Sequence, residues 1–119
     1  MTKVLVLGAG RIGVSIAQVL ADSGDYQVTL GEGMPEPPAA GGLGGVEHTM
    51  LDVNDAGALG RALGRVEVVI SALPYFLNVG VAEAAKASRV HYFDLTEDVG
   101  VARQVLALAE GAGSVFVPQ

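Results

Sequence analysis

Three regularly spaced glycines follow an apolar run at the start of this chain, and they limit what it can fold into more than any other feature. Residues 4–7 read Val-Leu-Val-Leu, and Gly8, Gly10 and Gly13 follow in a G-x-G-x-x-G pattern. Residues 11–23 then carry apolar side chains close to helical spacing. Between a buried strand and an amphipathic helix, this pattern predicts a turn that binds the phosphates of a dinucleotide.

Each glycine of this turn meets a separate physical need. The first allows a tight turn, the second lets the backbone approach the pyrophosphate, and the third lets the helix pack on the sheet. The start of the helix also points unpaired N–H groups at the phosphates, and its dipole stabilises a nearby charge by about 0.3–1 kcal/mol. The alternative interpretation is that the glycines only let a helix pack closely on a sheet.

An acidic residue follows the second predicted strand, residues 26–30. Glu32 lies 19 residues after Gly13, where a carboxylate accepts hydrogen bonds from the hydroxyls of the adenosine ribose. The same carboxylate would repel a 2′-phosphate, and no Lys or Arg occurs between Arg11 and Arg61. The sequence therefore favours NAD over NADP. The alternative is a solvated loop glutamate.

The rest of the chain alternates predicted strands with predicted helices. Strands are expected at residues 3–7, 26–30, 46–53, 66–73, 90–95 and 114–117, and helices at residues 11–23, 56–63, 79–88 and 99–110. Residues 34–45 are rich in Pro and Gly, which predicts a mobile loop or a degenerate turn of helix there. The alternation predicts an α/β fold of the Rossmann type, a doubly wound parallel sheet in three αβα layers with strand order 3-2-1-4-5-6.

Polar and small residues stand where the predicted strands end. Asp52 is placed either to meet the adenine amino group or to cap the next helix. Residues 71–74, Ser-Ala-Leu-Pro, follow the crossing point of the sheet, where small residues leave room for the nicotinamide half of a cofactor. Asp94 ends the fifth strand beside that place and has no helix to cap, so we count it with the cofactor site.

Other side chains near these strand ends receive structural interpretations. Asn78 and Thr96 are expected to cap the helices that follow them. His91 and Tyr92 alternate on the fifth strand, which favours sheet packing over catalysis. The loop aromatics at residues 75–76 have two open interpretations, as a cover for a ligand or as packing on a neighbouring helix.

The composition excludes several classes of function. The net charge is −6 and the seven Lys and Arg are scattered, which argues against a nucleic-acid surface. There is no Cys, the two isolated His make no metal site, and no apolar run approaches the ~18 residues of a membrane span. Residues 1–3 lead into the first strand without a signal peptide. We therefore expect a cytoplasmic protein that binds no nucleic acid, metal or membrane.

Four pieces of the sequence match one family. They are the glycine turn at 6–13, Ser-Ala-Leu-Pro at 71–74 with Asn78, His-Tyr-Phe-Asp-Leu-Thr-Glu at 91–97, and Phe-Val-Pro-Gln at 116–119. With these pieces the chain resembles the N-terminal NAD(P)-binding domain of the saccharopine dehydrogenase-like reductases. Many Rossmann proteins share the first piece, whereas the second and third are considerably more specific, and the resemblance covers essentially the whole chain.

The resemblance implies an activity, a set of contacts and a missing part. The activity is reversible reduction, by a nicotinamide, of an imine formed between an amine and a carbonyl compound, as in the saccharopine chemistry of lysine metabolism. The resemblance assigns the pyrophosphate to Gly8, Gly10, Arg11, Ile12 and Gly13, the ribose to Glu32, the adenine to Asp52 and Val53, and the nicotinamide ribose to Ser71, Ala72, Leu73 and Pro74. In this family a substrate domain follows the sixth strand, and residues 1–119 hold no counterpart to it. We therefore expect one dinucleotide-binding domain that has no catalytic residue of its own and forms a homodimer through the apolar face that the missing domain leaves exposed.

Two other classes of protein share parts of this pattern. A nucleotide-sensing Rossmann module, such as the cofactor domain of potassium-channel regulators, has a similar length, but residues 71–74 shape a nicotinamide floor that argues against it. A short-chain dehydrogenase needs a Tyr-x-x-x-Lys pair. None of Tyr26, Tyr75 and Tyr92 is followed four positions later by Lys.

Overall fold

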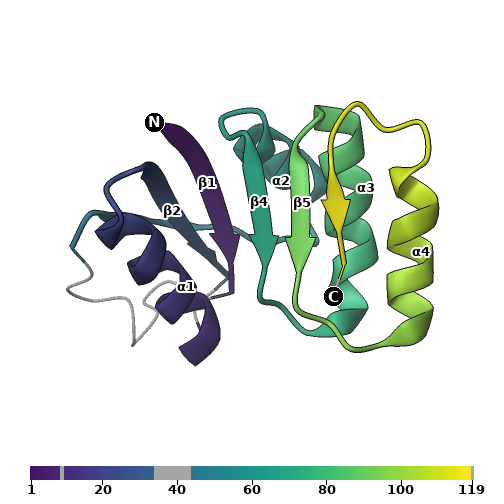
Figure 1. Cartoon of the computed structure of the whole chain (residues 1–119), viewed down its shortest axis with the longest axis horizontal. Helices are drawn as coiled ribbons and strands as arrows, with labels where there is room; N and C mark the ends of the chain where they lie inside the picture. Colours follow the sequence, from purple (N-terminus) through teal and green to yellow (C-terminus); the bar gives the residue numbers. More distant parts are fainter. Residues whose placement is uncertain (9, 34–43, 119) are drawn as a thin grey trace.

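The computed structural model describes residues 1–8, 10–33 and 44–118, which form a six-stranded parallel sheet in the order β3-β2-β1-β4-β5-β6 (Figure 1). The strands are β1 (Thr2–Leu7), β2 (Tyr26–Glu32), β3 (Val46–Met50), β4 (Val68–Ser71), β5 (His91–Asp94) and β6 (Phe116–Val117). The helices are α1 (Arg11–Asp22), α2 (Ala56–Leu63), the one-turn 3-10 helix η1 (Tyr75–Leu77), α3 (Asn78–Ser88) and α4 (Val99–Ala109). The predicted strand order and the layers of helices on both faces are confirmed.

Several element boundaries differ from the predicted ones. The third strand ends at Met50 rather than at residue 53, because Leu51 turns into the core and the Asp52 carboxylate accepts a hydrogen bond from the N–H of Asn54, 2.9 Å away. The second strand continues to Glu32, whose carbonyl accepts a hydrogen bond from Leu51. The loop expected at residues 34–45 lies almost entirely outside the described residues.

Helix α1 covers one face of β1 and β2. Its residue Ala17 is fully buried against four strand residues on that face, which are Val4, Val6, Val28 and Leu30. These four belong to near-continuous apolar runs, as expected for parallel strands that are buried on both sides. The packing fixes the start of α1 beside the carboxyl end of β1.

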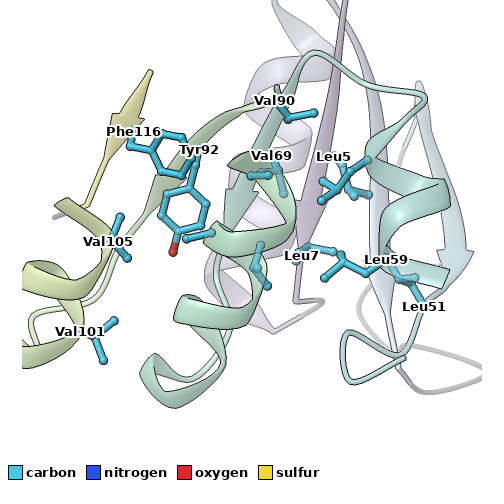
Figure 2. Packing of buried hydrophobic residues seen from close by; sticks show 14 residues of the cluster. Leu5, Leu7, Leu51, Leu59, Val69, Val90, Tyr92, Val101, Val105 and Phe116 are labelled. Atoms are coloured by element: carbon cyan, nitrogen blue, oxygen red, sulfur yellow. The ribbon is translucent and has the colours of Figure 1, made fainter. Parts of the chain in front are cut away.

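The opposite face is covered by α2, α3 and α4 and holds the larger core. Leu5, Val69, Tyr92 and Phe116 are aligned in register across β1, β4, β5 and β6 (Figure 2). The rings of Tyr92 and Phe116 stack with their centroids 5.6 Å apart. This row lies in the larger core, and the carboxyl ends of β4 and β5 follow it by two residues, at Ser71 and Asp94.

The face that carries α1 is only half covered. In Figure 1, α1 lies in front of β1 and β2, and no described helix lies in front of β4, β5 and β6. Ile70, Phe93 and Val117 are register partners on this half, and Phe93 and Val117 are 37% and 44% exposed. We call these three residues and their neighbours Val68 and His91 the bare face.

Among residues 1–8, 10–33 and 44–118, no helix is long and apolar enough to cross a membrane.

Candidate functional site

The first glycine of the turn makes a bend that other residues cannot make. Gly8 has φ +101°, in the region that L side chains rarely adopt. Its N–H donates a hydrogen bond to the carbonyl of Gly31, 3.0 Å away. A Cβ atom on Gly8 would lie 2.9 Å from the carbonyl oxygen of Ala72. The turn is therefore held between the carboxyl ends of β2 and β4.

The other two glycines of the turn differ in what surrounds them. A Cβ on buried Gly13 would overlap the carbonyl oxygen of Gly8, so only glycine lets α1 start this close to β1. A Cβ on Gly10 would meet no described atom within 4 Å. The backbone at Gly10 thus faces open space, as close approach of a pyrophosphate requires.

The start of α1 has no cap from its own side chains. Gly10 occupies the N-cap position, makes no side-chain cap hydrogen bond, and the first turn holds no acidic residue. By contrast, Asp55 caps α2 and Asp98 caps α4. The first N–H groups of a helix have no intrahelical acceptor, so those of α1 are available to an anion in front of Gly10.

Glu32 lies at the same edge of the sheet as the glycine turn. It is the last residue of β2 and directly follows Gly31, the hydrogen-bond partner of Gly8. Its side chain is half-buried, and Oε1 accepts a hydrogen bond from the N–H of Gly33 at 2.8 Å. The carboxylate is thus fixed beside the turn, where the ribose of a bound dinucleotide would lie.

Asp52 and Val53 follow β3 at this edge. Asp52 is exposed and binds the N–H of Asn54, whereas Asp55 accepts the capping bond from Ala58 at 3.1 Å. The interpretation of Asp52 as the helix cap is therefore wrong, and its contact with adenine stays a prediction. Val53 is half-buried and packs against the larger core.

A cleft opens between α1, β4 and β5. Its volume is about 610 Å³, and its walls are Ile12, Ala72, Leu73, Tyr75, Leu95, Thr96, Glu97 and Asp98. The cleft brings Ile12 of the glycine turn together with residues of the predicted nicotinamide floor. It also contains Leu95 and Thr96, which the sequence did not mark as site residues. Their position just past β5, next to the crossing point of the sheet, was the available signal.

A second hollow lies away from these groups. It measures about 520 Å³ and includes the side chains of Lys3, Glu47 and Arg65. Lys3 and Glu47 lie in β1 and β3 near the amino ends of the strands. Ligands of doubly wound sheets bind outside the carboxyl ends, so this hollow is not the candidate site.

Ser71 and Asn78 pair beneath the floor of the cleft. The Ser71 hydroxyl donates a hydrogen bond to Asn78 Oδ1 at 2.6 Å, and both side chains are 1% exposed. The prediction that Asn78 caps α3 is wrong, because Leu77 holds the cap position and the Asn78 side chain is turned toward β4. Pro74, the last residue of the floor, is exposed.

Asp94 is also beneath the surface, at 4% exposure. Its Oδ2 accepts a hydrogen bond from the Tyr92 hydroxyl at 2.7 Å, and its Oδ1 accepts one from the N–H of Thr96 at 3.1 Å. Burial, and then the hydrogen bond to Asp94 and its charge, raise the pKa of Tyr92 well above its usual range. The contact of Asp94 with a cofactor stays a prediction.

The segment after β5 is organised by side chains. Thr96 Oγ1 accepts a hydrogen bond from the N–H of Asp98 at 3.1 Å, and Asp98 Oδ1 accepts one from Val101 at 2.9 Å. The cap of α4 is therefore Asp98, and the prediction that Thr96 is the cap is wrong. Thr96 holds the cap in place instead.

One family of domains matches nearly the whole chain. A model of the family described as saccharopine dehydrogenase NADP binding domain matches residues 4–115. Among solved structures, the apo form of saccharopine dehydrogenase (L-Glu forming) from Saccharomyces cerevisiae superposes with a TM-score of 0.89 at 25% identity. The match covers 99% of this chain and 27% of the yeast chain, so this chain spans about a quarter of that enzyme.

Two further solved structures share the fold at lower identity. A Rossmann-fold NAD(P)-binding family protein from Shigella flexneri has a TM-score of 0.75 at 23% identity, covering 99% of this chain and 66% of that one. A UDP-glucuronic acid 4-epimerase from Bacillus cereus has a TM-score of 0.76 at 16% identity, covering 98% and 55%. With the glycine turn in front of an uncapped helix and the match over residues 4–115, this chain belongs to the family of saccharopine dehydrogenase NADP-binding domains, which bind a nicotinamide dinucleotide.

Proposed function

We propose that this chain is the cofactor-binding half of an oxidoreductase that reversibly reduces an imine formed between an amine and a carbonyl compound, in the cytoplasm and within lysine metabolism. The observation that carries the proposal is the glycine turn, in which Gly8 and Gly13 are sterically fixed and Gly10 faces open space. Family membership and the likeness to the yeast saccharopine dehydrogenase support the type of reaction.

The proposed contacts follow the order of the groups along the sheet edge. The pyrophosphate lies at the start of α1, on Gly10, Arg11 and Ile12, and the adenosine ribose lies on Glu32. The adenine lies toward Asp52 and Val53. The nicotinamide half enters the cleft whose walls include Ala72 and Leu73.

We further propose that NAD is preferred over NADP, although the family description names NADP. Glu32 is the supporting residue, because its half-buried carboxylate would repel a 2′-phosphate. The sequence from residue 12 to residue 60 contains no Lys or Arg to offset that charge.

Calorimetric titration of the purified chain with NADH and, separately, NADPH tests the proposed cofactor binding and the proposed preference for NAD. We expect NADH to bind more tightly, and Glu32→Ala to weaken NADH binding about tenfold while leaving NADPH binding unchanged or improved. Glu83→Ala, which removes an exposed acid on α3, is the matched control for net charge. Equal affinities for the two nucleotides would overturn the NAD preference, and no binding of either at millimolar concentration would overturn the cofactor role of the isolated chain.

Turnover is proposed to need a substrate domain that residues 1–119 do not contain. A hydride transfer requires the substrate to be held against the nicotinamide, and this chain matches only 27% of the yeast enzyme. The isolated chain should therefore bind the nucleotide without oxidising saccharopine. Oxidation at an ordinary enzyme rate would contradict this part of the proposal.

The isolated chain is also proposed to form a homodimer through the bare face. Phe93 and Val117 expose apolar surface there, and apolar patches of this kind tend to be covered. The five residues of the bare face include no acid, whereas the whole chain has a net charge of −6. Two copies would therefore meet there with little like-charge repulsion.

A further inference from the structure

One wall of the cleft has no regular secondary structure. Residues 95–98 follow β5 and precede α4, and they form the side of the cleft that faces Ile12 and Ala72. Two of their N–H groups, those of Thr96 and Asp98, donate to side chains within residues 94–98. The shape of this wall therefore depends on which side chains hold it.

The hydrogen bonds of this wall lead back to a single buried group. Asp98 is held by Thr96, Thr96 is held by Asp94, and Asp94 accepts from the Tyr92 hydroxyl. Tyr92 is 0% exposed and is stacked on Phe116 in the row of side chains that crosses the larger core (Figure 2). The anchor of the series is thus the best-packed aromatic residue of the protein's larger core.

The opposite wall is joined to the same anchor. Ser71 and Asp94 are register partners on β4 and β5. Ser71 binds Asn78, whose backbone carbonyl lies 3.5 Å from the Tyr92 hydroxyl. Ser71 Oγ also accepts a hydrogen bond from the N–H of Leu73, which lines the cleft.

We propose that Tyr92 and Asp94 are positioning residues for the nucleotide: through the hydrogen bonds of Asp94 they hold residues 95–98 in the conformation that the bound cofactor requires. This proposal rests on the proposed function, because the cleft must receive the dinucleotide. Tyr92 and Asp94 are the two buried side chains of β5 that carry polar groups, and the proposal assigns them a role in binding besides their role in stability. A tyrosine with its ordinary pKa of about 10 already keeps its proton at neutral pH, and the raised pKa of Tyr92 extends this to more alkaline pH, so the donor to Asp94 is present.

Asn78 adds a second constraint under the same floor. Its Nδ2 is buried and has no acceptor among the described residues. A buried donor without an acceptor destabilises the fold. The Asn78 side chain is oriented through its Oδ1, which accepts the hydrogen bond from Ser71.

Tyr92→Phe tests the proposal, because it removes one hydroxyl and keeps the ring in its stack. We expect the variant to fold, to bind NADH about 5- to 20-fold more weakly, and to lose hydrogen-exchange protection at the amides of Thr96 and Asp98. Phe116→Leu is the matched control. It weakens the same core without touching the hydrogen bonds, so it should lower stability while leaving NADH affinity unchanged.

A pair of substitutions at Thr96 gives an independent test. Thr96→Ser keeps the hydroxyl acceptor for Asp98 and should retain hydrogen-exchange protection at the Asp98 amide, whereas Thr96→Val removes the acceptor and should lose that protection. If Tyr92→Phe leaves either NADH affinity or amide protection at residues 95–98 unchanged, the positioning role is wrong. If instead the wild type binds neither NADH nor NADPH, the proposed function fails and the positioning of a nucleotide fails with it, whatever the exchange data show.

Discussion

At the scale of the residue, substitutions at Gly10 and Gly13 are expected to affect different properties, nucleotide binding at Gly10 and stability at Gly13. Gly13→Ala would place a Cβ on the carbonyl oxygen of Gly8, so we expect it to lower the free energy of unfolding by about 1–3 kcal/mol. Gly10→Ala points a methyl group into open space, so stability should change little while NADH binding weakens strongly. Thermal unfolding and NADH titration of both variants measure the two effects. A Gly10→Ala variant that binds NADH normally would argue against pyrophosphate at this position.

Tyr92 predicts a dependence of stability on alkaline pH. Its pKa is raised in the folded protein, so the folded state holds this proton more tightly than the unfolded state does. The contribution of the protonated Tyr92 to the free energy of unfolding is therefore complete below the ordinary tyrosine pKa of about 10 and is lost as pH rises above it. One proton contributes a slope of at most about 1.4 kcal/mol per pH unit. Urea unfolding between pH 9 and 11, at about half-unit steps, should show a shallower loss in Tyr92→Phe than in the wild type. Identical slopes would contradict the prediction.

Single residues also show where the sequence is an incomplete guide. The glycine turn could be predicted because each glycine answers a local need that the pattern itself expresses. The partners of Asn78, Asp94 and Thr96 could not be predicted. Asn78 bonds Ser71 on a neighbouring strand, whereas Asp94 and Thr96 bond groups only two residues away along the chain. A short polar side chain can bond its own helix, a nearby turn or a neighbouring strand, and the sequence alone does not choose among them.

At the scale of the element, the sequence predicted the helices and strands well and their ends less well. The parallel order followed from alternating apolar runs and from the right-handed crossover rule. The ends depended on side-chain contacts such as the Asx turn at Asp52, which stops β3 earlier than its apolar pattern does. Helix caps likewise depended on which of several neighbouring acids and hydroxyls faces the helix start.

The contribution of a side-chain cap to stability can be measured at α4. Asp98→Ala should lower the free energy of unfolding by about 1 kcal/mol, because it removes the acceptor for the N–H of Val101. Asp55→Ala should have a similar effect through α2, which makes it a matched comparison on a second helix. Chemical denaturation measures both. An Asp98→Ala variant as stable as the wild type would show that the cap does not contribute.

At the scale of the whole molecule, the uneven cover of the sheet predicts self-association of the isolated chain. Sedimentation equilibrium should show a mass that rises from monomer toward dimer with concentration. Phe93→Asp and Val117→Asp introduce charge on the bare face and should keep the chain monomeric. Leu106→Asp changes an exposed apolar residue of α4, outside that face, and should leave the equilibrium unchanged. A wild-type chain that stays monomeric at all concentrations would contradict the homodimer.

The turn between β1 and α1 has a consequence for how such domains diverge. The groups that we propose as its phosphate ligands are main-chain amides, and what the turn requires of the sequence is the absence of side chains at Gly8, Gly10 and Gly13. Substitutions elsewhere can accumulate without removing a single phosphate ligand. A chain that is only 25% identical to the yeast enzyme therefore keeps the same backbone course, with a TM-score of 0.89. In such a domain, the course of the backbone can persist after most of the amino-acid sequence has changed.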